Sequence, residues 1–274
     1  MKIGILGTGF IGQALAQFLH ENNFDILSLS RTKRDFPWRH ITDLVSFKEI
    51  SHDLDSIILA SGLSRPNQGN LQLEEQSTLS LLSDFKISSS LQIFYLSSGS
   101  VYGECDNAKS ESDLATPTTE YGETKLQIEN RLLKNYGDQV LNLRIGNVLN
   151  FTNPYGVIAQ VRKKLTENKT IHLNGYPDST RDYILIEDFC KVISTLLTSR
   201  FMGSVLNIGS GTSTNLRDIF QLIENNHKFK GEVLWAPPRE GDLQKTILDV
   251  RKMRDFTLCN PANPIKALSG YLLN

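Results

Sequence analysis

The sequence predicts an α/β protein with a Rossmann-type, doubly wound parallel sheet, followed by a smaller α/β part. Two observations lead to this prediction. Strand-like and helix-like segments alternate through the first half of the chain, which implies parallel strands joined by crossover helices. In addition, the glycine-rich segment GTGFIG, residues 7–12, lies directly between the first strand-like segment and the first helix-like segment.

Hydrophobic periodicity places the individual elements. Short apolar runs predict strands at 2–6, 24–30, 55–61, 92–98 and 140–148, and helical spacing predicts helices at about 10–21, 71–86 and 120–135. Beyond residue 150 the alternation loosens, and we expect a helix within 153–165, strands at 180–186, 205–209 and within 231–236, and a helix at 214–224 with Thr214 as its N-cap. The expected organisation is a Rossmann domain over 1–150, which also receives part of the later chain, and a second part over 151–274.

Composition excludes several classes of protein. The 274 residues carry a net charge of −1 without a long basic run, which argues against a nucleic-acid-binding surface. Three scattered cysteines and five scattered histidines show no ligand spacing, so we expect no metal site, and the cysteine usage fits a reducing cytoplasm. Glycines and glutamines interrupt the apolar N-terminus, and no apolar run is long enough for a membrane span. We therefore expect a cytoplasmic globular protein.

The glycine-rich segment has the spacing of a dinucleotide-binding turn. In such turns the first glycine permits a tight bend, the second lets the backbone approach a pyrophosphate, and the third allows close packing of helix on strand. The pyrophosphate binds at the positive end of the following helix. Cofactor contacts are therefore expected from the whole segment, Gly7, Thr8, Gly9, Phe10, Ile11 and Gly12. The alternative is a tight turn without a ligand.

The end of the strand at 24–30 bears on the type of cofactor. NAD sites usually carry Asp or Glu there, to bind the ribose 2′-hydroxyl. This chain has Ser30 and Arg31 instead, with Lys33 and Arg34 close behind. Because a guanidinium group can bind a 2′-phosphate bidentately, NADP(H) is favoured, and NAD(H) stays open. The alternative is a solvated basic loop. Asp43 lies where an acid could meet the adenine amino group.

Three residues form a candidate catalytic set. Tyr121 and Lys125 are four residues apart on a predicted helix and therefore share a face. Tyrosine is a weak base at neutral pH, but a nearby ammonium group favours its phenolate form, which could exchange a proton with an alcohol or ketone. Lys125 could also hold the nicotinamide ribose. Ser98, at the end of the strand at 92–98, could hydrogen-bond the same substrate oxygen. The alternative is that Tyr121 and Lys125 are an exposed pair four residues apart, beside an ordinary serine-rich turn.

With these motifs the chain resembles the extended short-chain dehydrogenase/reductase superfamily, in the branch that contains UDP-glucose 4-epimerase-like enzymes of nucleotide sugars. The resemblance rests on several segments in one order: GTGFIG, SSGSVYG, YGETK, LRIGNVLN, RDYILIEDF, VLNIGSG and PREGDLQKTILDVRKM. It implies that residues 151–274 bind a nucleotide sugar. It also implies substrate contacts by Ser98, Ser100, Asn147, Arg181, Arg239 and Asp242, nicotinamide-side contacts by Ala60 and Ser61, and a homodimer formed through the helices at 71–86 and 120–135.

Departures from the family pattern narrow the reaction. Gly99 and Ser100 stand where 4,6-dehydratases of the family carry Asp and Glu, and Ser100 stands where GDP-fucose synthases carry Cys. Dehydration and combined epimerisation and reduction are therefore disfavoured. Since Arg31 replaces an acid, we favour an NADPH-dependent reductase of an NDP-4-keto-sugar. A nucleotide-sugar 4-epimerase that retains NAD(P) and a non-catalytic cofactor sensor are the alternatives. The sequence leaves the nucleotide, the sugar and the reaction direction open.

Overall fold

The computed structural model describes most of the chain. The described residues are 1–50, 52–62, 88–150, 167, 170–175, 177–199, 201, 204–227, 232–237 and 242–267. The helices predicted at 71–86 and within 153–165, as well as Arg239, lie outside the described residues.

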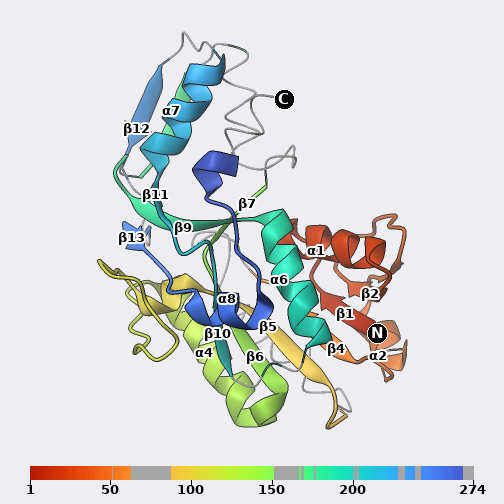
Figure 1. Ribbon diagram of the computed structural model, residues 1–274. Coiled ribbons are helices and arrows are strands. Elements are labelled where there is room, and N and C mark those ends of the chain that lie inside the picture. The colour runs from red at the N-terminus through yellow and green to blue at the C-terminus, as the bar shows by residue number, and fades with distance from the viewer. Residues whose placement is uncertain are drawn as a thin grey trace.

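The main sheet has seven parallel strands in the order β10-β6-β5-β4-β1-β2-β3 (Figure 1). Its strands are β1 (Lys2–Leu6), β2 (Asp25–Leu29), β3 (Arg39–Ile41), β4 (Ser56–Leu59), β5 (Gln92–Ser98), β6 (Val140–Ile145) and β10 (Val205–Ile208). The predicted doubly wound α/β fold is confirmed, because strand order runs outward in both directions from β1 and β4.

Helices cover both faces of this sheet. α1 (Phe10–Glu21), α6 (Ile186–Thr198) and α8 (Arg251–Thr257) pack on one face, and α2 (Leu44–Ile50) and α4 (Glu120–Tyr136) on the other (Figure 1). Neighbouring residues of one strand serve opposite cores: Ile57 packs in the cluster that contains Ile128 of α4, and Ile58 in the cluster that contains Leu15 of α1. Both faces of each central strand are therefore buried, as expected for a parallel sheet.

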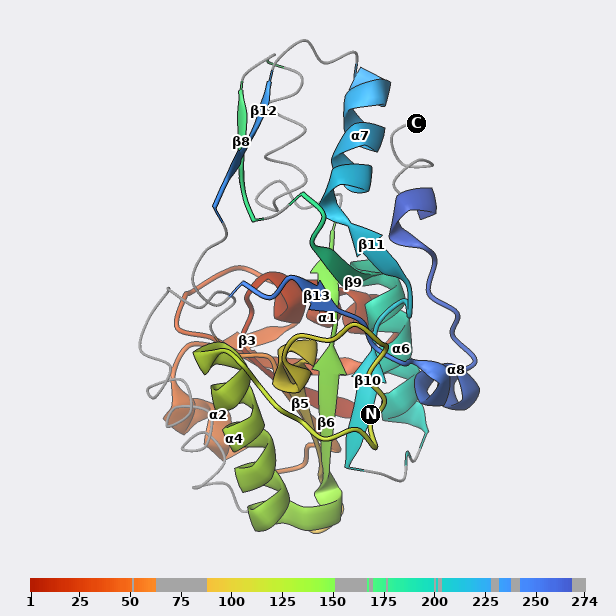
Figure 2. The ribbon, with the colours of Figure 1, turned by 90° about the vertical axis from the view of Figure 1, so that its left-hand side faces the viewer.

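The later chain adds two small sheets. One contains β9 (Thr180–Leu185), which pairs with β7 (Asn147–Leu149), β11 (Ser213–Asn215) and β13 (Lys245–Thr246); the other pairs β8 (Ile171–Asn174) with β12 (Val233–Ala236). With α7 (Leu216–His227), these elements stand at one end of the main sheet, beyond the carboxyl end of β6 (Figure 2). No helix within the described ranges is long and apolar enough to cross a membrane.

A single residue separates the two sheets along the chain. The strand predicted at 140–148 is in fact two strands, β6 in the main sheet and β7 in a small one, with Gly146 between them. A Cβ on Gly146 would lie 2.7 Å from the carbonyl oxygen of Asp182 in β9, so a side chain has no room there. The predicted strand ends because the backbone changes its pairing partner at Gly146.

The carboxylate of Asp182 ties β9 to the loop after β10. It accepts hydrogen bonds from the backbone nitrogens of Ser210 (2.7 Å) and Gly211 (2.9 Å), and from Ser210 Oγ (3.0 Å). The residue is 1% exposed, and burial raises the pKa of its carboxyl group to about 6. This contact joins the main sheet and a small sheet through a buried acid.

The predicted N-cap of the helix at 214–224 was wrong. Thr214 lies inside β11, paired with Arg181 of β9. Asn215 instead accepts a hydrogen bond from the backbone nitrogen of Asp218 at 2.7 Å, which is the capping contact of α7. Strand pairing therefore holds Thr214 extended and moves the start of the helix to Leu216.

Candidate active site

The carboxyl ends of the main-sheet strands bring most of the predicted site residues to one edge. GTGFIG follows β1, Ser30 follows β2, Ala60 follows β4, and Ser98 ends β5. Because all seven strands are parallel, these positions share the edge at which open α/β sheets bind ligands.

The glycine turn has the geometry that its three glycines predict. Gly7 has a φ of +107°, and a Cβ there would lie 2.5 Å from the backbone nitrogen of Ser61. A Cβ on Gly12 would lie 2.0 Å from the carbonyl oxygen of Gly7, so helix and strand touch. At Gly9, by contrast, a Cβ would meet no atom within 4 Å.

The opening at Gly9 lies at the start of α1. Gly9 is the N-cap of this helix and supplies no side-chain cap, so the first-turn N–H groups face the opening. A turn that is open only at its second glycine fits the pyrophosphate of a dinucleotide, and the positive end of the helix favours the phosphate charge. Thr8, Phe10 and Ile11 belong to the same turn and first helical residues.

The basic tip after β2 places one predicted cation in solvent and a second against the glycine turn. Arg31 is exposed. The Nη1 atom of Arg34 lies 2.8 Å from Gln13 Oε1 of α1 and 3.5 Å from the carbonyl oxygen of Thr8. Sequence reasoning noticed Arg34 only as one of several cations, since its contact with α1 depends on how the loop folds back.

A hydrogen-bonded chain holds this basic loop to the sheet. Trp38 Nε1 donates to Ser28 Oγ at 2.9 Å, and Ser28 Oγ lies 2.8 Å from His40 Nδ1, to which it donates when the neutral ring carries its proton on Nε2. His40 Nε2 then carries the proton and donates to the carbonyl oxygen of Thr32 at 3.1 Å. His40 thereby fixes the backbone between Ser30 and Arg34, and this role was not predicted.

Three further predicted cofactor residues differ in their surroundings. Asp43 accepts a hydrogen bond from the backbone nitrogen of Ser46 at 2.7 Å, which lowers the pKa of its carboxyl group and caps α2. Ala60 packs against the glycine turn, 3.1 Å from where a Gly12 Cβ would lie. The Ser61 hydroxyl is buried without a hydrogen-bond partner among the described residues, so it can still bond a ligand.

Ser98 opens a tight turn at the end of β5. It caps the 3-10 helix η1 (Gly99–Tyr102), and its Oγ accepts hydrogen bonds from the Ser100 backbone nitrogen (3.2 Å) and Ser100 Oγ (2.9 Å). With both contacts accepted from Ser100, the Ser98 hydroxyl keeps its own proton to donate. Ser100 therefore orients Ser98 in the turn.

Helix α4 carries Tyr121 and Lys125 close to this turn. Thr119 caps the helix by accepting a hydrogen bond from the Gly122 backbone nitrogen at 3.1 Å. A Cβ on Gly122 would lie 2.6 Å from the carbonyl oxygen of Ser100, so the glycine lets the helix touch η1. The structure thus brings the first turn of α4, with Tyr121, against the serine turn.

Lys125 is buried beneath the tyrosine. Only 4% of the residue is exposed, and its Nζ lies 5.5 Å from the ring centre of Tyr121 and 5.3 Å from that of Tyr95. The ammonium group of Lys125 lies beside the Tyr121 ring, as the four-residue spacing predicts. The arrangement can therefore support proton transfer by Tyr121.

The predicted substrate residues Asn147, Arg181 and Asp242 lie on or next to strands of the small sheet that contains β9. Asn147 is exposed in β7, directly after Gly146, and its register partner in β9 is Tyr183. Arg181 is half-buried in β9, two positions earlier. Asp242 is described and half-buried, shortly before β13, whereas Arg239 lies outside the described residues. The structure therefore does not test a meeting of Arg181 and Arg239.

A buried ion pair was missed by sequence reasoning. Arg144 of β6 donates to Glu129 of α4 through Nη2 (2.8 Å) and Nε (3.2 Å), and both residues are almost fully buried. In the sequence, Glu129 follows Lys125 at a spacing of four and Arg144 interrupts an apolar strand, but neither position identifies the other as its partner.

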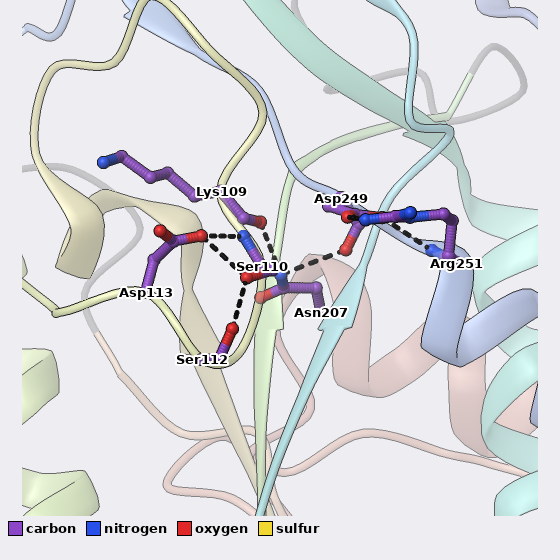
Figure 3. A network of polar contacts seen from close by, with 7 residues as sticks. All are labelled: Lys109, Ser110, Ser112, Asp113, Asn207, Asp249 and Arg251. Atoms are coloured by element: carbon purple, nitrogen blue, oxygen red, sulfur yellow. Dashed lines mark hydrogen bonds and ion pairs between the residues drawn. The ribbon is translucent and has the colours of Figure 1, made fainter.

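A surface depression lies away from these residues. It has a volume of about 710 Å³ and is lined by Ser110, Glu111, Phe201, Asp249, Arg251, Lys252, Asp255 and Phe256. Asp249 and Arg251 pair with each other there (Figure 3). None of the predicted site residues lines it, and Phe201 precedes β10, at the opposite end of the strands. Strand-end geometry therefore places the candidate site at the glycine turn.

The fold is that of an NAD(P)-binding Rossmann enzyme. The sequence profile of the "NAD dependent epimerase/dehydratase family" matches residues 5–209, and the chain belongs to this family. The predicted membership of the extended short-chain dehydrogenase/reductases is thereby confirmed, as is an NAD(P)-dependent enzyme of the nucleotide-sugar epimerase/reductase group.

The names of similar proteins include both reaction types. A Methanocaldococcus jannaschii protein provisionally named UDP-glucose 4-epimerase is 26% identical over 90% of this chain and 88% of its own length. The Escherichia coli dTDP-4-dehydro-6-deoxyglucose reductase is 26% identical over 92% of this chain and 90% of its own length. The specific reaction is therefore not decided by similarity.

Solved structures share the fold. MoeE5 in complex with UDP-glucose and NAD is 22% identical, with a TM-score of 0.85 over 100% of this chain and 98% of the other. The Thermotoga maritima UDP-glucose 4-epimerase with UDP-glucose is 20% identical, with a TM-score of 0.81 over 100% and 98%.

Proposed function

We propose that the protein is an NADPH-dependent reductase that acts on the 4-keto group of a nucleotide sugar. The observation that carries this proposal is the basic tip after β2. No acid follows β2 directly, Arg31 is exposed there, and Arg34 lies against the glycine turn. Guanidinium groups favour a 2′-phosphate over a hydroxyl. Enzymes that consume hydride in every cycle tend to use NADPH, and the similar E. coli enzyme is named as a reductase of a dTDP-4-dehydro sugar.

The chain's own residues would handle the proton. The nicotinamide, when bound, supplies hydride to the carbonyl carbon. Tyr121 donates its phenol proton to the carbonyl oxygen, and the Ser98 hydroxyl hydrogen-bonds the same oxygen as negative charge develops on it. Lys125, 5.5 Å from the ring centre of Tyr121, stabilises the phenolate that remains. Solvent then reprotonates Tyr121.

Binding of the nucleotide sugar is assigned to the later part of the chain, residues 151–274. Arg181 and Arg239 would hold the diphosphate, Asn147 and Ser100 would contact the sugar nucleotide, and Asp242 would bind a ribose hydroxyl. Gly99 and Ser100 offer no acid to protonate a leaving hydroxyl, which supports simple reduction rather than dehydration. In the cofactor site, Asp43 would meet the adenine, and Ala60 and Ser61 the nicotinamide side.

A 4-epimerase is the second candidate, and the M. jannaschii relative favours it. In that reaction Ser98, Tyr121 and Lys125 would serve two successive transfers at C4, and the cofactor would stay bound through the cycle. The two candidates therefore differ in whether NADPH is consumed.

The test is to purify the protein, release and identify any bound cofactor, and assay UDP-, dTDP-, GDP- and CDP-linked 4-keto sugars with NADPH. The corresponding nucleotide sugars with a 4-hydroxyl group are assayed with NADP⁺ for the reverse reaction. We expect little retained cofactor and a loss of absorbance at the reduced-nicotinamide band with at least one keto sugar. Tightly bound NAD, together with interconversion of 4-epimers without added NADPH, would overturn the reductase proposal.

We also propose a homodimer, for which size measurement in solution is the test. The family resemblance is what suggests it. The exposed positions of α4 are polar, among them Glu123, Gln127 and Asn130, so they add no apolar interface, and the other helix expected at the interface lies outside the described residues. A monomer at micromolar concentration would contradict this part of the proposal.

A further inference from the structure

The Glu129–Arg144 pair lies directly beneath the candidate catalytic residues. Tyr121, Lys125 and Glu129 follow one another at a spacing of four, so they occupy one face of α4 at successive turns. Glu129 is 1% exposed and Arg144 is 6% exposed. The ion pair therefore fixes the buried side of the helix to β6, one turn below the lysine.

Both ends of the serine turn attach to the same pair. Ser97, the residue before Ser98, donates a hydrogen bond from Oγ to Glu129 Oε1. The ring of Tyr102, at the other end of η1, lies 4.7 Å from the Arg144 guanidinium carbon. Ser98 is thus held between two residues that contact one ion pair.

The contacts continue to the far side of the turn. The Tyr102 hydroxyl donates to Asn207 Oδ1 at 2.9 Å, and burial raises the pKa of this phenol, which keeps its proton in place. Asn207 Nδ2 donates to the backbone oxygens of Lys109 (2.8 Å) and Asp249 (3.1 Å), as Figure 3 shows for the Asn207 end. The orientation of the Asn207 amide is therefore determined by its partners.

A buried ion pair is seldom the most stable way to fill a core, because desolvation offsets much of the attraction, and apolar replacements of similar volume are often as stable. Its directional contacts are what an apolar core would lack. Here those contacts join β6 and η1 to β5, which carries Ser98, and to α4, which carries Tyr121 and Lys125.

We infer that Glu129 and Arg144 are positioning residues that set the distance between the Ser98 hydroxyl and the Tyr121 phenol. This inference rests on the proposed Ser-Tyr-Lys chemistry. Neither residue touches the substrate in this account; both act through Ser97, Tyr102 and the buried face of α4.

The experiment compares three variants with the wild type. Glu129→Gln keeps the shape but leaves Arg144 without its charge partner. The double variant Glu129→Met, Arg144→Met removes the pair and replaces it by apolar side chains, so its folding can recover. Leu196→Ala, in the α6 core on the opposite face of the sheet, is the control for loss of stability alone.

Steady-state kinetics are measured at a temperature at which every variant is folded. We expect the double variant to lose about 10- to 100-fold in kcat, the effect of a misplaced catalytic group, with the NADPH dissociation constant changed less than twofold. Leu196→Ala should keep the kcat of the wild type. A double variant that is stable and has the kcat of the wild type would overturn the inference.

A crystal structure of the double variant gives a readout that does not depend on turnover. We expect the separation of Ser98 Oγ and the Tyr121 hydroxyl to change by more than about 0.5 Å, the tolerance of a productive site. An unchanged separation contradicts the positioning role. If the wild type is inactive with every nucleotide sugar while the separation does change, the proposed function fails and the positioning role stands.

Discussion

The candidate catalytic residues and the basic tip of the cofactor site differ in how they are held. Lys125 is buried under two aromatic rings, and Ser98 lies in a turn whose two flanking residues contact a buried ion pair. Arg31, by contrast, is exposed, and the contacts of Arg34 with Gln13 and Thr8 lie at the surface. Both groups stand at the same edge of one sheet.

This difference teaches which property of the enzyme is costly to alter. Changing a buried group leaves its partners without hydrogen bonds or charge compensation, whereas an exposed side chain can be replaced with little effect on folding. We therefore expect the chemistry to be fixed by the fold and the choice of cofactor to be adjustable. Four substitutions test that contrast.

The largest effect is expected at the tyrosine. Tyr121→Phe removes the proton that the carbonyl oxygen needs, so kcat should fall by about 10²- to 10⁴-fold. The matched control is Tyr136→Phe, at the other end of the same helix and half-buried, which should keep kcat within about twofold. Steady-state measurement of NADPH oxidation gives kcat for both variants. Equal NADPH oxidation by the two variants would contradict the catalytic role of Tyr121.

The second-largest effect is expected for the pH dependence of stability that Asp182 causes. Asp182 is a further buried group of the kind compared here. Burial raises its pKa to about 6, above the value near 3.8 of an unperturbed Asp. Below about pH 4 the group is protonated in both the folded and the unfolded state. Between about pH 4 and 6 only the folded state holds the proton, so stability is lost as pH rises, by roughly 3 kcal/mol in total.

Chemical denaturation at pH 4 and pH 7 measures this response. Asp182→Asn lacks the titration and loses a hydrogen bond from Ser210 or Gly211, so at pH 4 it should be less stable than the wild type by about 1–3 kcal/mol. The difference in free energy of unfolding between the wild type and Asp182→Asn should become smaller toward pH 7, because the wild type loses stability there. Asp178→Asn, which changes an exposed aspartate, is the control and should follow the pH dependence of the wild type. Parallel pH profiles for Asp182→Asn and wild type would refute the buried titration.

The exposed side of the comparison predicts a smaller and more selective effect. Arg34→Ala should raise the KM for NADPH about 13- to 30-fold, which corresponds to about 1.5–2 kcal/mol, the lower part of the range for a hydrogen bond to a charged group, because the contact lies at the surface. The KM for NADH and the melting temperature should hardly change. Arg217→Ala removes the same charge at a surface pair with Asp178 and is the control. An equal rise for both cofactors would show that Arg34 shapes the turn and does not read the phosphate.

The smallest effect is expected at Asp43. Its substitutions distinguish a role in capping α2 from a role in binding the cofactor. As the cap of α2 it contributes about 0.5–2 kcal/mol, so Asp43→Ala should lower the free energy of unfolding by that amount. Asp43→Ser can still cap the helix and should recover stability. If Asp43 also binds the adenine, both variants weaken cofactor affinity, as measured by fluorescence titration. Unchanged affinity in both would remove Asp43 from the cofactor site.

The strand-end motifs could be predicted from sequence because each needs only one strand and the residues that follow it. GTGFIG, Ser98 and the Tyr121–Lys125 spacing belong to this kind. Arg34 and His40 could not be predicted, since their contacts depend on the loop folding back onto α1 and β2. Their sequence positions alone describe an exposed basic loop.

Missed helices and buried charges have their own physical causes. Helix α6 begins without a side-chain cap, directly after the strand residue Leu185, so no start signal marks it. Glu129 lies on a buried face only because Arg144, distant in sequence, comes to meet it. A charged residue on an otherwise apolar face is more often solvated, and composition alone offers no partner for it.

The single glycine between β6 and β7 limits how this enzyme can be recombined. Gly146 leaves no linker between the sheets, and the main sheet needs β10 from the later half of the chain. The parts before and after residue 150 therefore cannot be exchanged independently with those of a relative. A chimera with a relative that exchanges substrate preference must transfer residues 140–149, 180–185 and 205–211 as one unit, so that Gly146, Asp182 and Ser210 arrive together.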